Sequence, residues 1–230
     1  MNITQGTSRM LPQSFFRWTG LALMLAGALT LLISIALTPL VAGADRPFVE
    51  TAASSAFLWR QSLSALAAAL LLFGSVGLYL LQANRAGRFG AVAFAMAFVG
   101  SALLLAWEWV DIFILHDLAL RAPDALRVLD EQEGLHFYDL GALIPIGLFA
   151  LGWIALAVST IRVCRPHRRA AWLLVIGFFA VPMLSAAFGP LWGGALGNAV
   201  LCSGWILLGL AVSRGTALDA TGGPAGDLAP

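Results

Sequence analysis

The amino-acid sequence predicts an all-α fold, a polytopic membrane protein built as a bundle of six transmembrane helices. The chain of 230 residues is 60% hydrophobic and only 11% charged, whereas soluble domains carry about 25% charged residues. Its apolar residues fall into six runs, each long enough to cross a hydrocarbon core about 30 Å thick, which takes about 20 helical residues. Polar or arginine-containing segments separate these runs. Together, composition and segment length predict an integral membrane protein.

We expect one transmembrane domain, residues 17–213, between a flexible N-terminal tail, residues 1–16, and a flexible C-terminal tail, residues 214–230. Both tails lack an apolar run, and the second is rich in Gly, Ala, Asp and Pro, a composition that does not bury a core. The predicted membrane spans are residues 18–42, 59–82, 89–112, 140–161, 170–188 and 191–212.

The first two predicted spans each have a face of small or polar side chains. From Ala22 to Thr38, every fourth residue is alanine, serine or threonine. Small residues let helix backbones approach one another, so this face is expected to pack against protein. In the second span, polar side chains follow helical spacing from Arg60 to Tyr79, again typical of a face turned toward other helices.

The third predicted span follows a tight turn at residues 84–88 and ends in Trp107-Glu108-Trp109-Val110-Asp111. A polar segment, residues 117–133, comes next. Its helix is expected to begin at Pro123. Leu126 on one face of that helix predicts an amphipathic helix lying on the membrane surface.

The last three predicted spans are joined by short connections. A basic loop with four arginines leads from the fourth span into the fifth, which contains Pro182, and Gly189-Pro190 turns the chain into the sixth. Short connections favour antiparallel neighbours. The sixth span contains Gly193-x-x-x-Gly197, a pattern typical of close helix packing in membranes.

The arginines predict the orientation. All 13 basic residues are arginine. Alternating the loops across the membrane leaves nine of them on the side of both termini and four on the other side. By the positive-inside rule both termini are therefore cytoplasmic. The abundance of arginine, alanine, leucine and glycine is typical of a bacterial gene, so the expected location is the inner (plasma) membrane.

This orientation brings the charged residues of three spans to the outer membrane boundary. Arg60, Glu108, Asp111, His136 and Asp139 are all expected there, and we predict that they form one polar cluster. Arg60 would pair with Glu108 or Asp111, and His136-x-x-Asp139 would face Glu108-x-x-Asp111. Carboxylates in or beside a bilayer are costly unless they are paired, so they usually face protein or water.

Three interpretations of the cluster remain open. It is favoured as a salt-bridge network that fixes how the helices meet, because it lies near the membrane edge. Alternatively, Arg60, Glu108, Asp111 and Tyr79 line a binding site for a substrate, an ion or a proton. The third interpretation is a metal site whose ligands are His136, Asp139, Glu108 and Asp111, since histidine and carboxylates at i, i+3 spacing on facing helices suit zinc or iron.

Other chemistries have no support in the sequence. There is no Gly-x-Ser-x-Gly, phosphate-binding loop or dinucleotide-binding motif, so we predict neither a catalytic residue nor a cofactor. Cys164 and Cys202 are expected to be unpaired packing residues. The expected partners are the lipid bilayer and either other proteins or further copies of the chain, docked through the small-residue helix faces. No nucleic-acid partner is expected.

The run from Trp59-Arg60 through Gly74-Ser75-Val76-Gly77-Leu78-Tyr79 to Glu108-Trp109-Val110-Asp111 resembles an uncharacterised group of small bacterial multi-span membrane proteins. The resemblance covers the second to fourth spans and implies no activity or site. It strengthens the prediction of a membrane protein and lowers the expectation of a known enzyme. The function we expect is that of a non-enzymatic accessory or structural membrane component. The alternatives are a small-molecule, ion or proton transporter and a metal-dependent membrane enzyme.

Overall fold

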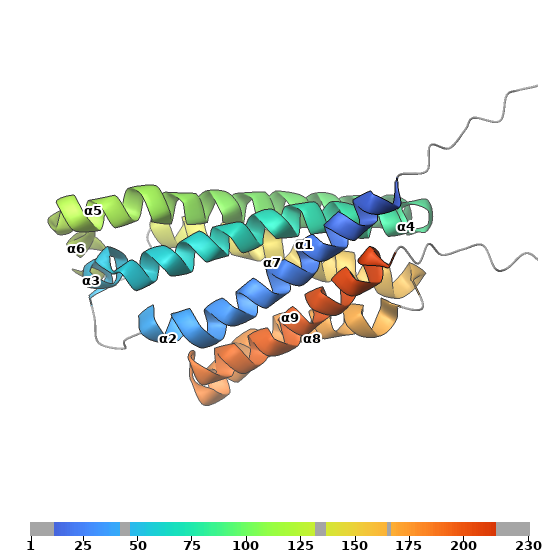
Figure 1. Ribbon diagram of the computed structural model, residues 1–230. Coiled ribbons are helices and arrows are strands. Elements are labelled where there is room, and N and C mark those ends of the chain that lie inside the picture. The colour runs from blue at the N-terminus through green and yellow to red at the C-terminus, as the bar shows by residue number, and fades with distance from the viewer. Residues whose placement is uncertain (1–11, 42–46, 132–136, 165–166, 215–230) are drawn as a thin grey trace, which may run out of the picture.

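The computed structural model describes residues 12–41, 47–131, 137–164 and 167–214, and every regular element in these ranges is a helix. The prediction of an all-α fold is therefore confirmed. Five helical stretches are long and apolar enough to cross a membrane. The elements, labelled in Figure 1, are α1 (Gln13–Leu32), the π-helix η1 (Ile33–Leu37), α2 (Thr38–Val41), α3 (Phe48–Ala53), α4 (Ser55–Val110), the π-helix η2 (Asp111–Leu115), α5 (His116–Arg121), α6 (Pro123–Glu131), α7 (Phe137–Val163), α8 (Arg168–Phe188) and α9 (Trp192–Ser213).

The element α4 consists of two helices joined at Gly87. The φ of 57° and ψ of −158° at this glycine are not helical, and the chain reverses direction there (Figure 1). No atom lies within 4 Å of where a Cβ would be, so the backbone conformation, and not lack of space, favours glycine. The two halves of α4, residues 55–86 and 88–110, lie against each other, and the rings of Tyr79 and Phe94 stack with centroids 4.5 Å apart.

The long helices close into a ring. The hairpin α4 packs on α7, α7 on α8, α8 on α9, α9 on α1, and α1 back on α4. Backbones approach closely where glycines lie at the contacts. A Cβ on Gly100 would come within 2.4 Å of the backbone nitrogen of Phe149, and one on Gly152 within 2.3 Å of the backbone nitrogen of Ala97. The α4–α7 contact therefore depends on these two glycines.

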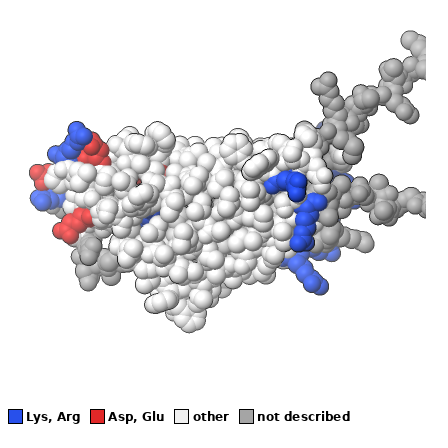
Figure 2. All heavy atoms as spheres, viewed as in Figure 1, with Lys and Arg blue, Asp and Glu red and all other residues white. Residues whose placement is uncertain are grey.

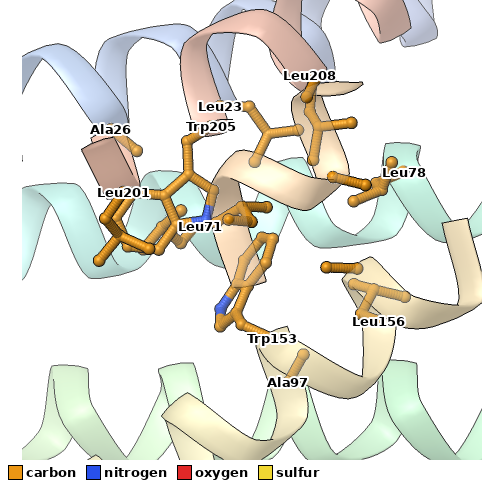
Figure 3. Close-up of a cluster of buried hydrophobic side chains, with 14 of the residues drawn as sticks. Leu23, Ala26, Leu71, Leu78, Ala97, Trp153, Leu156, Leu201, Trp205 and Leu208 are labelled. Atoms are coloured by element: carbon orange, nitrogen blue, oxygen red, sulfur yellow. The ribbon is translucent and has the colours of Figure 1, made fainter. Parts of the chain in front are cut away.

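The centre of the ring is filled by aromatic and aliphatic side chains (Figure 3). Trp153 of α7 and Trp205 of α9 are fully buried and meet edge to face, with ring centroids 5.7 Å apart. The rings of Phe149 and Phe178 pack against Trp205. The indole N–H of Trp153 donates a hydrogen bond to Ser101 Oγ at 3.1 Å. Because large side chains occupy the axis of the bundle, its centre is a packed core.

A second, smaller core lies at one end of the bundle, where α3, α5 and α6 meet; we call this the cap end. It is formed by Val49, Ala52, Phe57, Leu115, Ala119 and Leu126. The ring nitrogen Nδ1 of His116 is 2.7 Å from the carbonyl oxygen of Ala52 and ties α5 to α3.

Two details of the cap end differ from the sequence-based expectation. The helix of the third predicted span does not end at residue 112 but runs on through η2 and α5 to Arg121. Leu126 packs into the second core and does not face lipid headgroups. Both differences have one cause, because Leu115, Ala119 and Leu126 are buried together with side chains of α3 in the second core, a contact that local patterning does not reveal.

Two π-helical turns interrupt the long helices near this end. In the first, η1, Thr38 Oγ1 donates to the carbonyl oxygen of Ile33 at 3.1 Å. Pro39, just beyond it, has no N–H and its ring clashes with the carbonyl four residues earlier, which accounts for a local widening of the helix. The second, η2, begins at Asp111 and contains no proline.

Charge divides between the two ends of the bundle (Figure 2). The opposite end, which we call the arginine end, holds the Gly87 turn, the starts of α1 and α8 and the ends of α7 and α9 (Figure 1). Its described arginines are Arg17, Arg85, Arg88, Arg162, Arg168, Arg169 and Arg214. Every acidic side chain that the structure describes lies at or near the cap end: Glu50, Glu108, Asp111, Asp117 and Asp124.

Candidate functional site

The candidate site is a polar cluster next to the second core. It lies where the first half of α4 faces the end of the second half and the start of η2. It consists of Arg60, Gln61, Ser64, Glu108 and Asp111, and we call it the Glu108 cluster. Gln61 is 4% exposed, Glu108 9% and Asp111 3%. Three strongly polar side chains are thus nearly removed from solvent at one place, although unpaired buried polar groups are costly.

Gln61 links the two charged ends of this cluster. Its side-chain oxygen accepts a hydrogen bond from the Arg60 guanidinium, and its amide nitrogen donates to Asp111 Oδ2 at 2.5 Å. The sequence predicted that Arg60 pairs with a carboxylate, and the structure adds Gln61 as the bridge. A neutral amide next to a charged residue is a weak sequence signal for a functional site. The available clue was the position of Gln61 near the start of an apolar span, where an amide group needs a hydrogen-bond partner.

Glu108 is the least satisfied member of the cluster. Its carboxyl group is hydrogen-bonded by Ser64, and the charges of Arg60 and Asp111 act on it. Its Oε2 atom is buried and has no hydrogen-bond partner among the described residues. A buried carboxyl oxygen without a hydrogen-bond partner among the described residues suits a group that takes up a proton or attracts a cation.

Helical geometry explains why the two carboxyl groups act on the same arginine. Glu108 and Asp111 are three residues apart in a helix, so their side chains lie on the same face. The π-turn that begins at Asp111 changes the direction of the helix face immediately afterwards. Glu108 and Asp111 therefore face the first half of α4. Leu115 and Ala119, beyond the turn, face the second core. Such π-turns often occur at functional sites.

Of the other predicted site residues, the structure describes the side chain of Tyr79. Tyr79 is 19 residues from Arg60 along α4, or about 28 Å at 1.5 Å per residue, and its half-buried ring packs on Phe94. Its part in a binding site stays a prediction. His136 lies outside the described residues, and Asp139 belongs to α7 but its side chain is not described.

The described residues contain no group of three or more histidine, cysteine, aspartate or glutamate side chains that could hold a metal ion. The metal-site hypothesis consequently depends on His136 and Asp139. The two cysteines, Cys164 and Cys202, are both buried and unpaired. Burial raises the pKa of the Cys164 thiol above its ordinary value, although the nearby Arg85 opposes this. A buried thiol with a raised pKa is a poor nucleophile.

The geometry therefore defines a buried acidic group, an amide-bridged ion pair and a packed centre between two charged ends. Comparison of the chain with protein-family models, with curated proteins and with solved structures finds no match in any of the three.

Proposed function

We propose that the protein is a bacterial inner-membrane protein that crosses the membrane six times, with both termini in the cytoplasm. The break at Gly87 supports six crossings, because it divides the 67-residue stretch Ser55–Arg121 into two antiparallel helices. The gathering of arginines at the arginine end supports a cytoplasmic position for that end. Exposed tryptophans lie toward both ends, with Trp18 at the start of α1 and Trp192 at the start of α9, as expected for interfacial anchors.

A reporter enzyme that is active only in the periplasm tests this topology. Fused after residue 230, it is expected to be silent. Inserted into the segment at residues 42–46, which joins α2 to α3 in the sequence, it is expected to be active. Activity of the C-terminal fusion would contradict the proposed orientation without bearing on the helical fold.

We further propose that the protein acts as a non-enzymatic accessory or structural component of the membrane. The packed aromatic centre is the observation that carries this proposal. Trp153 and Trp205 occupy the axis of the ring. Ser75, a polar residue of the second predicted span, is fully buried and donates to the carbonyl oxygen of Leu72. A bundle whose axis is filled in this way suits a scaffold better than a conduit.

The small-residue faces are engaged within the chain. A Cβ on Gly193 would come within 1.9 Å of the carbonyl oxygen of Leu184, and one on Gly197 within 2.5 Å of Val181 Cα, so the Gly-x-x-x-Gly motif joins α9 to α8. A partner protein or a second copy would therefore need another surface. The exposed charged residues of α5 and α6, among them Arg121 and Arg127, offer such a surface at the cap end.

Photo-crosslinking in intact cells tests the accessory role. A photoreactive amino acid at Arg121, on the cap end, is expected to give one discrete protein adduct. The matched control is Phe73, a 67% exposed side chain in the middle of the first half of α4, which should give lipid adducts only. No protein adduct from Arg121, or identical adducts from both positions, would contradict the proposal.

The Glu108 cluster supports a second candidate function, the movement of protons or small cations. The unpartnered Oε2 of Glu108 is the observation that favours it. In liposomes that contain the purified protein and a pH-sensitive dye, this function predicts a proton flux above that of protein-free liposomes. The flux would be abolished by Glu108→Gln and retained in Asp117→Asn. The accessory role predicts no such flux.

A further inference from the structure

Two pockets lie side by side at the arginine end, one on each side of the last turn of α9. The first has a volume of about 370 Å³ and is lined by His167, Arg169, Ala170, Leu207, Leu210, Ala211 and Arg214. The second has a volume of about 600 Å³ and is lined by Gln13, Arg17, Leu21, Met24, Ser213 and Arg214. Arg214 belongs to both pockets, so a single guanidinium lies between them.

Each pocket combines basic and apolar side chains. The first places Arg169 and Arg214 next to Leu207 and Leu210. The second places Arg17 and Arg214 next to Leu21 and Met24. A ligand that fits such a pocket has an anionic group for the guanidinium groups and a hydrocarbon part for the leucine and methionine side chains.

The arginines of these pockets have no acidic neighbour in the part of the chain that the structure describes. At the cap end, Arg121 is 2.8 Å from Asp117, and Arg127 is 3.0 Å from Asp124. At the arginine end, Arg162 lies over the ring of Phe89 and Arg168 donates to the carbonyl oxygen of Ile161. Arg17, Arg169 and Arg214 are instead exposed around the pockets, so their charge is available to an anion.

The position of the pockets fits the headgroup region of a membrane. They lie where α1 begins and α9 ends, close to the exposed indole ring of Trp18, and tryptophan is enriched at that depth. Basic pockets between transmembrane helices on the cytoplasmic side bind the phosphates of anionic lipids. Guanidinium groups bind phosphate through two parallel hydrogen bonds.

We propose that the two pockets together bind one anionic phospholipid that carries two phosphates, of the diphosphatidylglycerol (cardiolipin) class. One phosphate occupies each pocket, with Arg17 on one side, Arg169 on the other and Arg214 between them. The acyl chains lie along the apolar walls. This inference rests on the membrane embedding of the chain and not on its accessory role.

Lipid binding to the full-length protein in neutral detergent, followed by native mass spectrometry, tests the proposal. Cardiolipin is expected to be retained at concentrations about tenfold lower than phosphatidylglycerol, which has one phosphate; inorganic phosphate, the third probe, is expected not to be retained. Arg17→Gln and Arg169→Gln should each weaken cardiolipin binding about fivefold, since one arginine near a membrane surface contributes roughly 1 kcal/mol. Arg214→Gln should weaken it most.

The matched control is Arg88→Gln, which removes an exposed arginine from the same end but outside both pockets. It is expected to leave cardiolipin binding unchanged. An equal loss in Arg88→Gln would indicate general attraction to charge and overturn the proposal, as would equal retention of cardiolipin and phosphatidylglycerol. If Arg214→Gln does not fold, Arg214→Lys keeps the charge but loses the paired hydrogen bonds, and should still bind more weakly than the unchanged protein.

The outcome is separable from the proposed topology and role. Reporter fusions and crosslinking do not depend on lipid binding, so a failure of cardiolipin binding leaves both intact. Conversely, a lipid site shown with purified protein holds even if Arg121 yields no protein adduct in cells.

Discussion

The two ends of the bundle differ in whether their arginine side chains have partners within the protein. At the cap end, each described arginine has an acidic or amide partner, as in the Arg60–Gln61–Asp111 chain and the Arg121–Asp117 pair. At the arginine end, Arg17, Arg169 and Arg214 surround pockets with no acidic side chain among their described lining residues. At the cap end the charges are paired within the protein, whereas these three arginines are exposed. The cap end is therefore held together by its own polar contacts, and the arginine end is the one for which we propose an anionic lipid.

Removing the acceptor of the buried chain at the cap end should have the largest effect. Asp111→Ala leaves the side-chain amide of Gln61 without its charged acceptor in a buried site, and breaking a buried charged interaction costs about 3 to 5 kcal/mol. We expect a loss of this size in the free energy of unfolding, measured by titration with a denaturing detergent in mixed micelles. A loss below about 1 kcal/mol would mean that the cluster behaves as an exposed surface pair and is not a cohesive element.

The second core should respond next. Leu126→Ala removes a buried side chain from α6, and such truncations cost about 2 to 5 kcal/mol. Because the main contacts of α6 among the described residues are with α3 and α5, we expect faster hydrogen exchange in α3 and α6 and unchanged exchange in α8 and α9. Faster exchange throughout the bundle would show that the two cores unfold together.

The exposed ion pairs of the cap end should contribute little. Asp117 and Arg121 are more than half exposed, and such pairs contribute about 0 to 1 kcal/mol. Asp117→Asn is therefore expected to leave the unfolding free energy almost unchanged, and to do so at both low and high salt. A cost comparable to that of Asp111→Ala would remove the distinction between buried and exposed charge at this end.

The smallest effect is expected at the arginine end, from acidification. Burial lowers the pKa of His167 below its ordinary value of 6.5, so the folded protein binds this proton less readily than the unfolded chain. The corresponding stability is complete above the ordinary pKa and is lost as the pH falls below it. In neutral detergent, the Tm should fall between pH 7 and pH 5, and should fall less in His167→Gln.

His116 at the cap end provides the control for that measurement. Its ring contacts the carbonyl oxygen of Ala52, so His116→Gln should lower the Tm at neutral pH through the loss of this contact. An unchanged pH profile in His167→Gln would show that the acid sensitivity arises elsewhere.

The sequence was informative wherever a property is carried by many residues in a row. Hydropathy and length predicted the long apolar helices, and the glycine in the 84–88 segment predicted the turn that separates the two halves of α4. The local signal at Pro123 agrees with the observed start of α6, and the one at Gly189-Pro190 agrees with the observed end of α8. These features depend on segment composition or on backbone conformation, both of which can be read from local sequence.

Features that depend on contacts between distant residues could not be predicted in this way. Gln61 reaches Asp111 across 50 positions of sequence, and α5 remains helical because Ala119 is buried against α3. Tyr79 shares a polar face with Arg60 in sequence, yet its ring packs on Phe94 of the returning helix. In each case the partner comes from another helix, so only the tertiary arrangement decides what the side chain does.

The π-turn at Asp111 allows one continuous helix to pack against two different neighbours, the first half of α4 before the turn and α3 after it. An α-helix advances about 100° per residue, so one additional residue in a turn rotates everything beyond it by roughly that angle relative to the preceding face. Deleting a single residue among Ile112, Phe113 and Ile114 would restore regular α-helical geometry and turn Leu115 and Ala119 away from α3. The number of residues in this turn, as much as side-chain chemistry, therefore sets which way α5 faces. A one-residue deletion there would rotate α5 relative to α3 and the rest of the cap end.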